Sequence, residues 1–176
     1  MYSVRRPSSQ RFIKQYKSVS YKFHAVHGRG HHYVPWKDIS GWKCIRCGQC
    51  CREYIVSLSY YEALILALKH NAPIIKMKNK YYLMPRADGS CPFLTKIGSV
   101  AYCRIYYERP TVCKLYPFYV SNRPVYGKAS RAEIIKDGET YYVYVDKVCR
   151  GVNRSKNIEE VVRYYIELWK RYTKTT

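Results

Sequence analysis

One stretch of eight residues decides how this chain folds, Cys44-Ile45-Arg46-Cys47-Gly48-Gln49-Cys50-Cys51. It holds four of the eight cysteines of the chain, at the spacing C-x2-C-x2-C-C. Thiols this close together oxidise readily and thiolates repel one another, whereas a bound cation removes both problems, because the thiolate is the form of cysteine that binds metals. We therefore expect the chain to fold back and bring its later cysteines to this run. The candidate metal ligands are Cys44, Cys47, Cys50, Cys51, Cys91, Cys103, Cys113 and Cys149.

Disulfide bonds are the alternative use of an even number of cysteines. The N-terminus has basic residues without an apolar stretch behind them, which predicts a cytoplasmic protein without a secretory signal. Disulfides are uncommon in that compartment outside hyperthermophiles, and the adjacent Cys50 and Cys51 argue against a simple disulfide framework. The sequence contains no run of about 18 apolar residues, so no transmembrane helix is predicted. The sequence therefore favours metal binding over disulfides.

The charge of the chain indicates a polyanionic partner. Its 176 residues include 32 basic and 12 acidic side chains, a net charge of +20, together with 21 tyrosines. Such self-repulsion weakens a compact state unless a polyanion neutralises it, and tyrosine suits stacking surfaces. RNA or a ribonucleoprotein such as the ribosome is the favoured partner. An anionic membrane surface comes second, and a solvated cationic surface without a partner is the plain alternative.

Residues 1–43 form a basic N-terminal arm in this interpretation. They hold nine lysines and arginines and one acid, a net charge of +8, and glycine and proline interrupt their periodicity. We expect the arm to become ordered on its partner, with a short strand compatible with residues 18–25 and with Trp36 and Trp42 as its anchors to the domain. The candidate nucleic-acid-binding residues are Arg5, Arg6, Arg11, Lys14, Lys17, Lys22 and Arg29.

The remainder, residues 44–176, predicts a small metal-stapled cysteine-cluster domain of the α+β class. Ser59 and Glu62 form a capping-box pattern that begins a central helix ending near residue 70. Two β-hairpins are predicted, over 74–84 around Lys78-Asn79 and over 131–145 around a type I′ turn at Asp137-Gly138. A short helix is predicted over 110–117, and apolar residues at helical spacing predict a C-terminal helix over 157–173.

The cysteine pattern resembles the CxxCxxCC family, also called YkgJ-like cysteine cluster proteins. The matching pieces are the run 44–51, CPFL at 91–94, CRIYYERPTVCKLYP at 103–117, and Cys149 with the glycine that follows at 151. This resemblance spans all eight cysteines in order and implies a zinc- or iron-chelating domain. The family includes flagellin lysine-N-methylases, so the resemblance implies a site more definitely than an activity.

The spacing favours an iron–sulfur cluster, with zinc as the alternative. Zinc sites usually use two separated C-x2-C pairs, whereas cysteines at three-residue spacing and a remote Cys-Pro, here Cys91-Pro92, are typical of iron–sulfur proteins. Gly48 stands where a tight turn needs a positive φ. Eight thiolates can form two four-cysteine sites, or one site with additional structural or redox-active thiols. The cations expected to offset thiolate charge are Arg46, Arg52, Arg104 and Lys114.

Three functional hypotheses follow. The favoured one is a non-enzymatic module that binds RNA or a ribonucleoprotein through phosphate contacts and base stacking. The second is an iron–sulfur redox or electron-transfer protein. The third is an accessory or relative of the protein lysine N-methylases, but the sequence has neither a GxGxxG-like loop nor the CxxxCxxC spacing of radical-SAM proteins. The sequence therefore favours a non-enzymatic protein without deciding the question.

Overall fold

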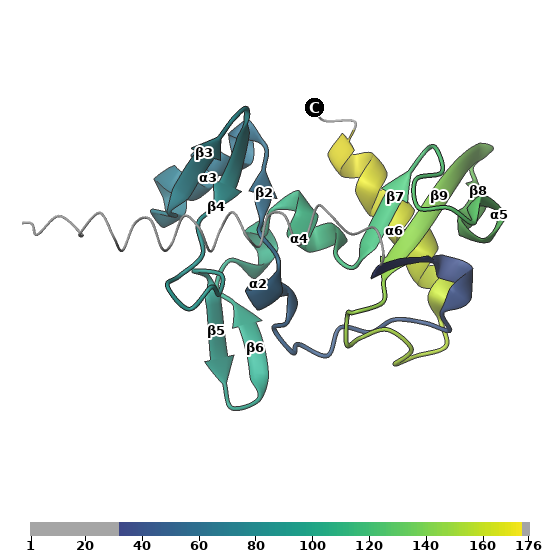
Figure 1. Ribbon diagram of the computed structural model, residues 1–176, viewed down its shortest axis with the longest axis horizontal. Coiled ribbons are helices and arrows are strands. Elements are labelled where there is room, and N and C mark those ends of the chain that lie inside the picture. Colours follow the sequence, from purple (N-terminus) through teal and green to yellow (C-terminus); the bar gives the residue numbers. More distant parts are fainter. Residues whose placement is uncertain (1–31, 174–176) are drawn as a thin grey trace, which may run out of the picture. The chain divides into compact units, whose positions relative to one another are not determined.

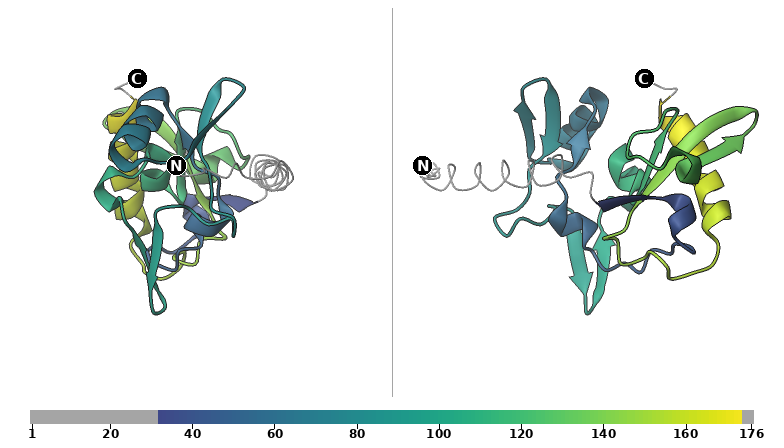
Figure 2. Two further views of the ribbon diagram at one scale, coloured as in Figure 1. Left: turned by 90° about the vertical axis from the view of Figure 1, so that its left-hand side faces the viewer. Right: turned by 45° about the vertical axis from the view of Figure 1, so that its right-hand side comes forward.

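The computed structural model describes residues 32–173, which divide into two compact units. Unit 1 contains residues 51–92, and unit 2 contains the described residues up to Cys50 together with residues 93–173. Most of the helices and strands of both units are labelled in Figure 1, and Figure 2 shows them from two further directions. Helices and antiparallel strands are mixed throughout, which confirms the predicted α+β class.

Unit 2 is built on a four-stranded antiparallel sheet with β9 (Glu139–Asp146) at its centre. Along one edge, β9 pairs with β7 (Phe118–Ser121). Along the other edge it pairs with β8 (Glu133–Lys136) and then with β1 (Tyr33–Pro35). In the β8–β9 hairpin, Asp137 and Gly138 have φ values of 53° and 77°, as a type I′ turn requires.

The core of unit 2 lies between this sheet and α6 (Ile158–Thr173). Alternate residues of β9, including Val143 and Val145, face the helix and are fully buried. The helix buries Val162, Tyr165 and Ile166 on the same side. The C-terminal helix and its apolar stripe are therefore confirmed.

The cysteine-bearing segments of unit 2 extend from this framework. The hairpin of β5 (Leu94–Ile97) and β6 (Val100–Cys103) ends on Cys103, and its turn uses a left-handed Gly98. Three short helical segments complete the unit around these strands. They are η2 (Trp36–Asp38), η3 (Tyr106–Glu108) and α5 (Ala129–Ala132). The predicted short helix is present as α4 (Thr111–Leu115).

Unit 1 combines one helix with a three-stranded sheet. The helix α3 (Tyr60–His70) begins at the predicted capping box, in which the Ser59 hydroxyl accepts from the Glu62 N–H and the Glu62 carboxylate accepts from the Ser59 N–H. The sheet has the order β2 (Ser57–Leu58), β4 (Lys80–Leu83), β3 (Ile74–Met77). The short helix α2 (Cys50–Glu53) contains the residue boundary between the units.

The arm predicted over residues 1–43 differs from the structure at its C-terminal end. Tyr33–Pro35 form β1 in the sheet, Trp36 is buried in the core, and Arg131 forms an ion pair with Asp38. Residues 33–43 therefore belong to the folded unit. Pairing with β9 satisfies the backbone hydrogen bonds of Tyr33–Pro35, and burial of the Trp36 indole stabilises the segment. The rest of the arm, including the strand compatible with residues 18–25, lies outside the described residues. Among residues 32–173, no helix is long and apolar enough to span a bilayer.

Candidate metal centre

The cysteine run folds as an irregular, tightly turned segment before α2. Arg46 and Gly48 both have left-handed backbone conformations, with φ values of 51° and 72°. The turn predicted at Gly48 is therefore present. The Ala101 N–H donates to the Arg46 carbonyl at 2.8 Å, which attaches the run to β6. This attachment holds the run beside the strand that delivers Cys103.

Three further cysteines of unit 2 arrive on different elements. Cys103 ends β6, Cys113 lies in α4, and Cys149 follows β9. The buried Asp146 holds the last of these turns, because its carboxylate accepts from the Val148 N–H at 3.0 Å and its carbonyl accepts from the Cys149 N–H at 3.1 Å. All of these cysteines carry thiols that are half-buried, and Cys44 is exposed.

The pKa values of two of these thiols reflect the other thiols that lie near them. Burial raises the pKa of the Cys103 thiol, and the nearby Cys50 adds to the rise. Burial also raises the pKa of the Cys149 thiol, with further contributions from Cys47 and Cys50. The structure thus places Cys50 near Cys103, and both Cys47 and Cys50 near Cys149. Burial raises the pKa of Tyr165, and Cys44 and Cys149 both add to this rise, so Cys44 also lies near Tyr165.

The segment that carries Cys149 lies against residues 40–43 at unusually short range. The Lys43 N–H donates to the Gly151 carbonyl at 3.0 Å, and the Asn153 N–H donates to the Gly41 carbonyl at 2.8 Å. A Cβ at Gly151 would lie 2.4 Å from the Lys43 carbonyl oxygen. Only glycine fits there, and the close approach brings Trp42 to Cys149, whose sulfur accepts from the indole N–H at 3.4 Å.

Cations lie beside the same thiols. Arg104 and Arg109 both lower the Cys103 pKa, against the dominant effect of burial, which raises it. The Arg109 guanidinium also stacks on Tyr106, 4.0 Å from the ring centroid. Arg104 was expected from the sequence, whereas Arg109 was not. The sequence signal for Arg109 is its place next to Pro110, the N-cap of the helix that carries Cys113.

The two cysteines of unit 1 are held near each other by the backbone. The Cys91 N–H donates to the Cys51 carbonyl at 2.7 Å. The turn before Cys91 is stabilised by Asp88, whose carboxylate accepts from the Ser90 N–H at 2.9 Å and from its hydroxyl at 2.7 Å. These hydrogen bonds hold the pKa of Asp88 below its usual range. The local fold of unit 1 therefore pairs these two cysteines at the backbone level.

The thiol positions are not closed into a coordination sphere. Within residues 32–173, no three His, Cys, Asp or Glu side chains stand at positions that could hold a metal ion together. The donor chemistry nevertheless fits a thiophilic metal, because cysteine residues from the run, from β6 and from the turn after β9 converge on one region of unit 2. The cysteine side chains therefore have to shift when the metal binds, as is usual where metal binding and folding are coupled.

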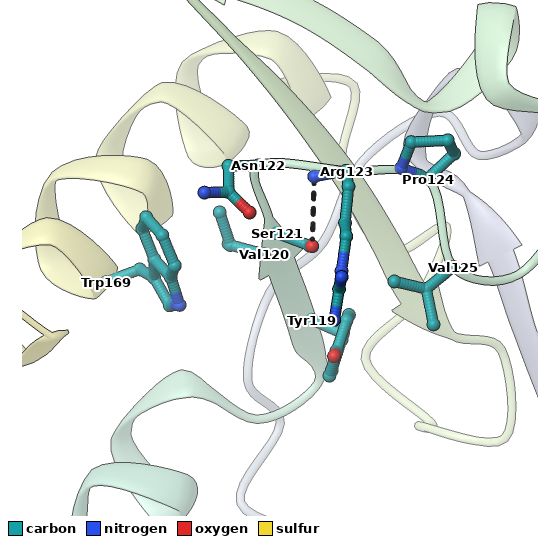
Figure 3. A pocket seen from close by; sticks show the side chains of 8 residues that line it. All are labelled: Tyr119, Val120, Ser121, Asn122, Arg123, Pro124, Val125 and Trp169. Atoms are coloured by element: carbon teal, nitrogen blue, oxygen red, sulfur yellow. Dashed lines mark hydrogen bonds between the residues drawn. The ribbon is translucent and has the colours of Figure 1, made fainter.

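A hollow at the edge of β7 is another feature that could bind a ligand. Residues 119–125 line one side and Trp169 of α6 lies on the other (Figure 3). The lining contains Arg123 but no Cys, His, Asp or Glu. The hollow therefore lacks the donors that a metal centre needs. The nucleic-acid-binding residues expected on the arm, Arg5 to Arg29, lie outside the described residues.

Comparison with known proteins agrees with the thiol chemistry. Residues 43–155 match the sequence model of the CxxCxxCC family, described as "Putative zinc- or iron-chelating domain". The chain is also 28% identical over 140 residues to the uncharacterised protein MJ0661 of Methanocaldococcus jannaschii, which covers 74% of this chain and 69% of that protein. No solved structure matches.

Proposed function

The chain belongs to the CxxCxxCC family and carries its metal-binding cysteine-cluster domain, and we propose that Cys47, Cys50, Cys103 and Cys149 form the centre. The observation that supports this choice is that Cys50 raises the pKa of both the Cys103 and the Cys149 thiols, and Cys47 raises that of Cys149. Four cysteines are the ligand set of a structural zinc site and of [2Fe–2S] and [4Fe–4S] clusters. Cys44 and Cys113 are further proposed ligands of this centre, and Cys51 and Cys91 of unit 1 are proposed ligands of a second one.

Metal binding at this centre completes the fold of unit 2. The four ligands come from the run, from β6 and from the turn after β9, segments that are far apart in the sequence. A metal that binds all of them therefore crosslinks these segments, and its binding free energy stabilises the folded state. The cations Arg104 and Arg109 offset the negative charge of the bound thiolates.

For the metal we propose an iron–sulfur cluster, with zinc as the alternative. The support is the C-x2-C-x2-C spacing and the Cys91-Pro92 pair. The proposed location is the cytoplasm, where reducing conditions keep thiols available as ligands. Anaerobic purification followed by elemental analysis and a visible spectrum decides between the two metals. Iron, acid-labile sulfide and visible absorption support the cluster, whereas zinc in colourless protein rejects it.

Replacing Cys50 by serine tests the proposed ligand set. Cys50 lies near both Cys103 and Cys149, because it raises the pKa of both thiols. Its loss should therefore lower the amount of bound metal and the melting temperature together. The matched control is Cys91→Ser in unit 1, which should leave the metal of the proposed centre in place. If Cys50→Ser retains the stoichiometry and melting temperature of the unaltered protein, Cys50 is not a ligand and the proposed set is wrong.

A second proposed function is binding of RNA or a ribonucleoprotein, favoured by exposed tyrosines beside arginines. Tyr107 is 91% exposed, and its neighbour Tyr106 lies under the Arg109 guanidinium. The guanidinium of Arg46, in the cysteine run, lies over the ring of Tyr102 of β6, 5.8 Å from its centroid. Such rings can stack on unpaired bases while arginines contact phosphates. The net charge of +20 adds a general attraction.

The salt dependence of binding tests this function. A footprint of about six phosphates weakens binding about a thousandfold between roughly 50 and 200 mM salt. Removing residues 1–31, which hold seven lysines and arginines and no acid, should lower both affinity and salt slope. The truncation ends before β1 so that the sheet stays intact. A specific complex survives a modest excess of heparin; if no RNA or ribosome association is detected at low salt, the redox hypothesis takes its place.

A further inference from the structure

The indole of Trp42 makes a specific contact with one proposed ligand. Its Nε1–H donates to the Cys149 sulfur at 3.4 Å, across 107 residues of sequence. An N–H group so placed stabilises negative charge on the sulfur. The contact is therefore directed at the thiolate form, which is the form that binds metal.

Neighbouring rings hold this indole in place. Phe118 of β7 packs edge-on against Trp42, with ring centroids 5.6 Å apart and an interplanar angle of 85°. Tyr165 of α6 packs in the same manner at 5.7 Å and 90°. Because both rings belong to the buried core, the sheet and the helix together determine where the indole N–H points.

The backbone on the other side is adapted to the same contact. A Cβ at Gly151 would lie 2.9 Å from Trp42 Nε1, so a side chain there would displace the indole from the sulfur. A Cβ at Gly41 would lie 2.3 Å from the Ser155 carbonyl oxygen. Two glycines thus permit the backbone approach that places Trp42 beside Cys149, and the donor is built into the fold from both sides.

We propose that Trp42 is a positioning residue of the metal centre, whose indole N–H fixes the Cys149 sulfur in its ligating orientation. This inference rests on the proposed function of Cys149 as a ligand. Hydrogen bonds from outside the coordination sphere orient the ligands, and their removal lowers metal affinity about 10- to 100-fold. Hydrogen bonds to ligand sulfurs also change the electronic properties of the metal.

The chain provides a matched control in Trp36. Trp36 belongs to the same core cluster, but its buried indole N–H has no hydrogen-bond partner. Replacing either tryptophan by phenylalanine removes one indole from the same core. Only the change at residue 42 removes an N–H···S hydrogen bond. A difference between the two variants therefore reports on the hydrogen bond rather than on the loss of core volume.

The experiment uses Co²⁺ as the probe, titrated into full-length metal-free protein under anaerobic conditions in competition with a chelator. We expect Trp42→Phe to lower Co²⁺ affinity about 10- to 100-fold and to shift the sulfur-to-cobalt charge-transfer absorption. Trp36→Phe should leave both quantities unchanged. A third variant carries 3-benzothienylalanine at residue 42, which keeps the shape of the indole and lacks its N–H, and it should behave like Trp42→Phe.

The possible outcomes separate this inference from the proposed function. If the unaltered protein binds Co²⁺ and the benzothienyl variant matches it in affinity and spectrum, Trp42 has no positioning role while the metal centre stands. If both tryptophan→phenylalanine variants lose affinity equally, core volume and not the hydrogen bond is responsible. If the unaltered protein does not bind Co²⁺ through thiolates, the proposed function fails and the inference fails with it.

Discussion

Replacing Gly151 by alanine tests the close approach between residues 41–43 and the segment after Cys149. The φ angle of Gly151 is not in the left-handed region, so alanine meets no conformational barrier there. The cost comes from contact alone, because the new Cβ would lie 2.4 Å from the Lys43 carbonyl oxygen and 2.9 Å from Trp42 Nε1. The carbonyl belongs to the backbone and cannot rotate away.

The structure offers two ways to relieve this clash, and both lead to a similar magnitude. If the backbone stays in place, overpacking costs about 1–3 kcal/mol. If the two segments separate, the hydrogen bonds from Lys43 to Gly151 and from Trp42 to Cys149 are lost, at about 0.5–1.5 kcal/mol each. We therefore expect a loss of about 1–3 kcal/mol in unfolding free energy, and a melting temperature lower by about 2–12 °C.

Urea unfolding followed by circular dichroism measures the loss, and Co²⁺ titration measures the effect on the thiols. The control is Gly138→Ala in the β8–β9 turn, where a Cβ meets no atom within 4 Å but φ is +77°. That variant should lose about 1–2 kcal/mol through backbone strain and keep its metal affinity. The reasoning is refuted if Gly151→Ala is as stable as the unaltered protein and binds Co²⁺ equally well.

The other predictions concern the two units separately. Ile166→Ala should cost about 2–5 kcal/mol in urea unfolding, because its side chain is fully buried under the sheet; a loss below about 1 kcal/mol would contradict the core described for unit 2. Ser59→Ala should cost about 0.5–2 kcal/mol by removing the cap of α3, seen as faster amide exchange in that helix and not in α6. Hydrogen bonds from Lys136 and Lys170 hold the pKa of Asp137 below its usual range. That stabilisation is present above the unfolded-state pKa of about 3.9 and is lost as pH falls through the folded value. Asp137→Asn should therefore reduce the acid dependence of unfolding, and an unchanged dependence would count against this network.

The parts of the fold that depend on neighbouring residues were predictable from the sequence. The Ser59 cap, the left-handed pair Asp137-Gly138 and the positive φ at Gly48 all follow from the preferences of a few adjacent residues. The apolar stripe of α6 follows from helical spacing. Local chemistry therefore predicted α3, α4, α6 and two of the hairpins.

The remaining features depend on contacts between distant residues. Nothing near Tyr33 in the sequence reveals that it pairs with Asp146 at the centre of the sheet, so residues 33–43 were assigned to an arm. The β5–β6 hairpin was missed because three of the four β5 residues are exposed and lack alternation. The thiols were recognisable as candidate ligands, whereas the contact of Trp42 with Cys149 exists only after both segments meet.

The position of β1 on β9 also determines the order of events during synthesis. The first strand of the sheet cannot pair until its partner has been made, because Tyr33 lies opposite Asp146. At translation rates of about 5–20 residues per second, the ribosome needs roughly 5–20 s to proceed from the cysteine run to Cys149. During that interval the nascent chain presents the thiols of the run without their last partner. Metal delivery to the proposed centre therefore has either to wait until the turn after β9 has been made or to begin with a partial set of ligands that this turn completes.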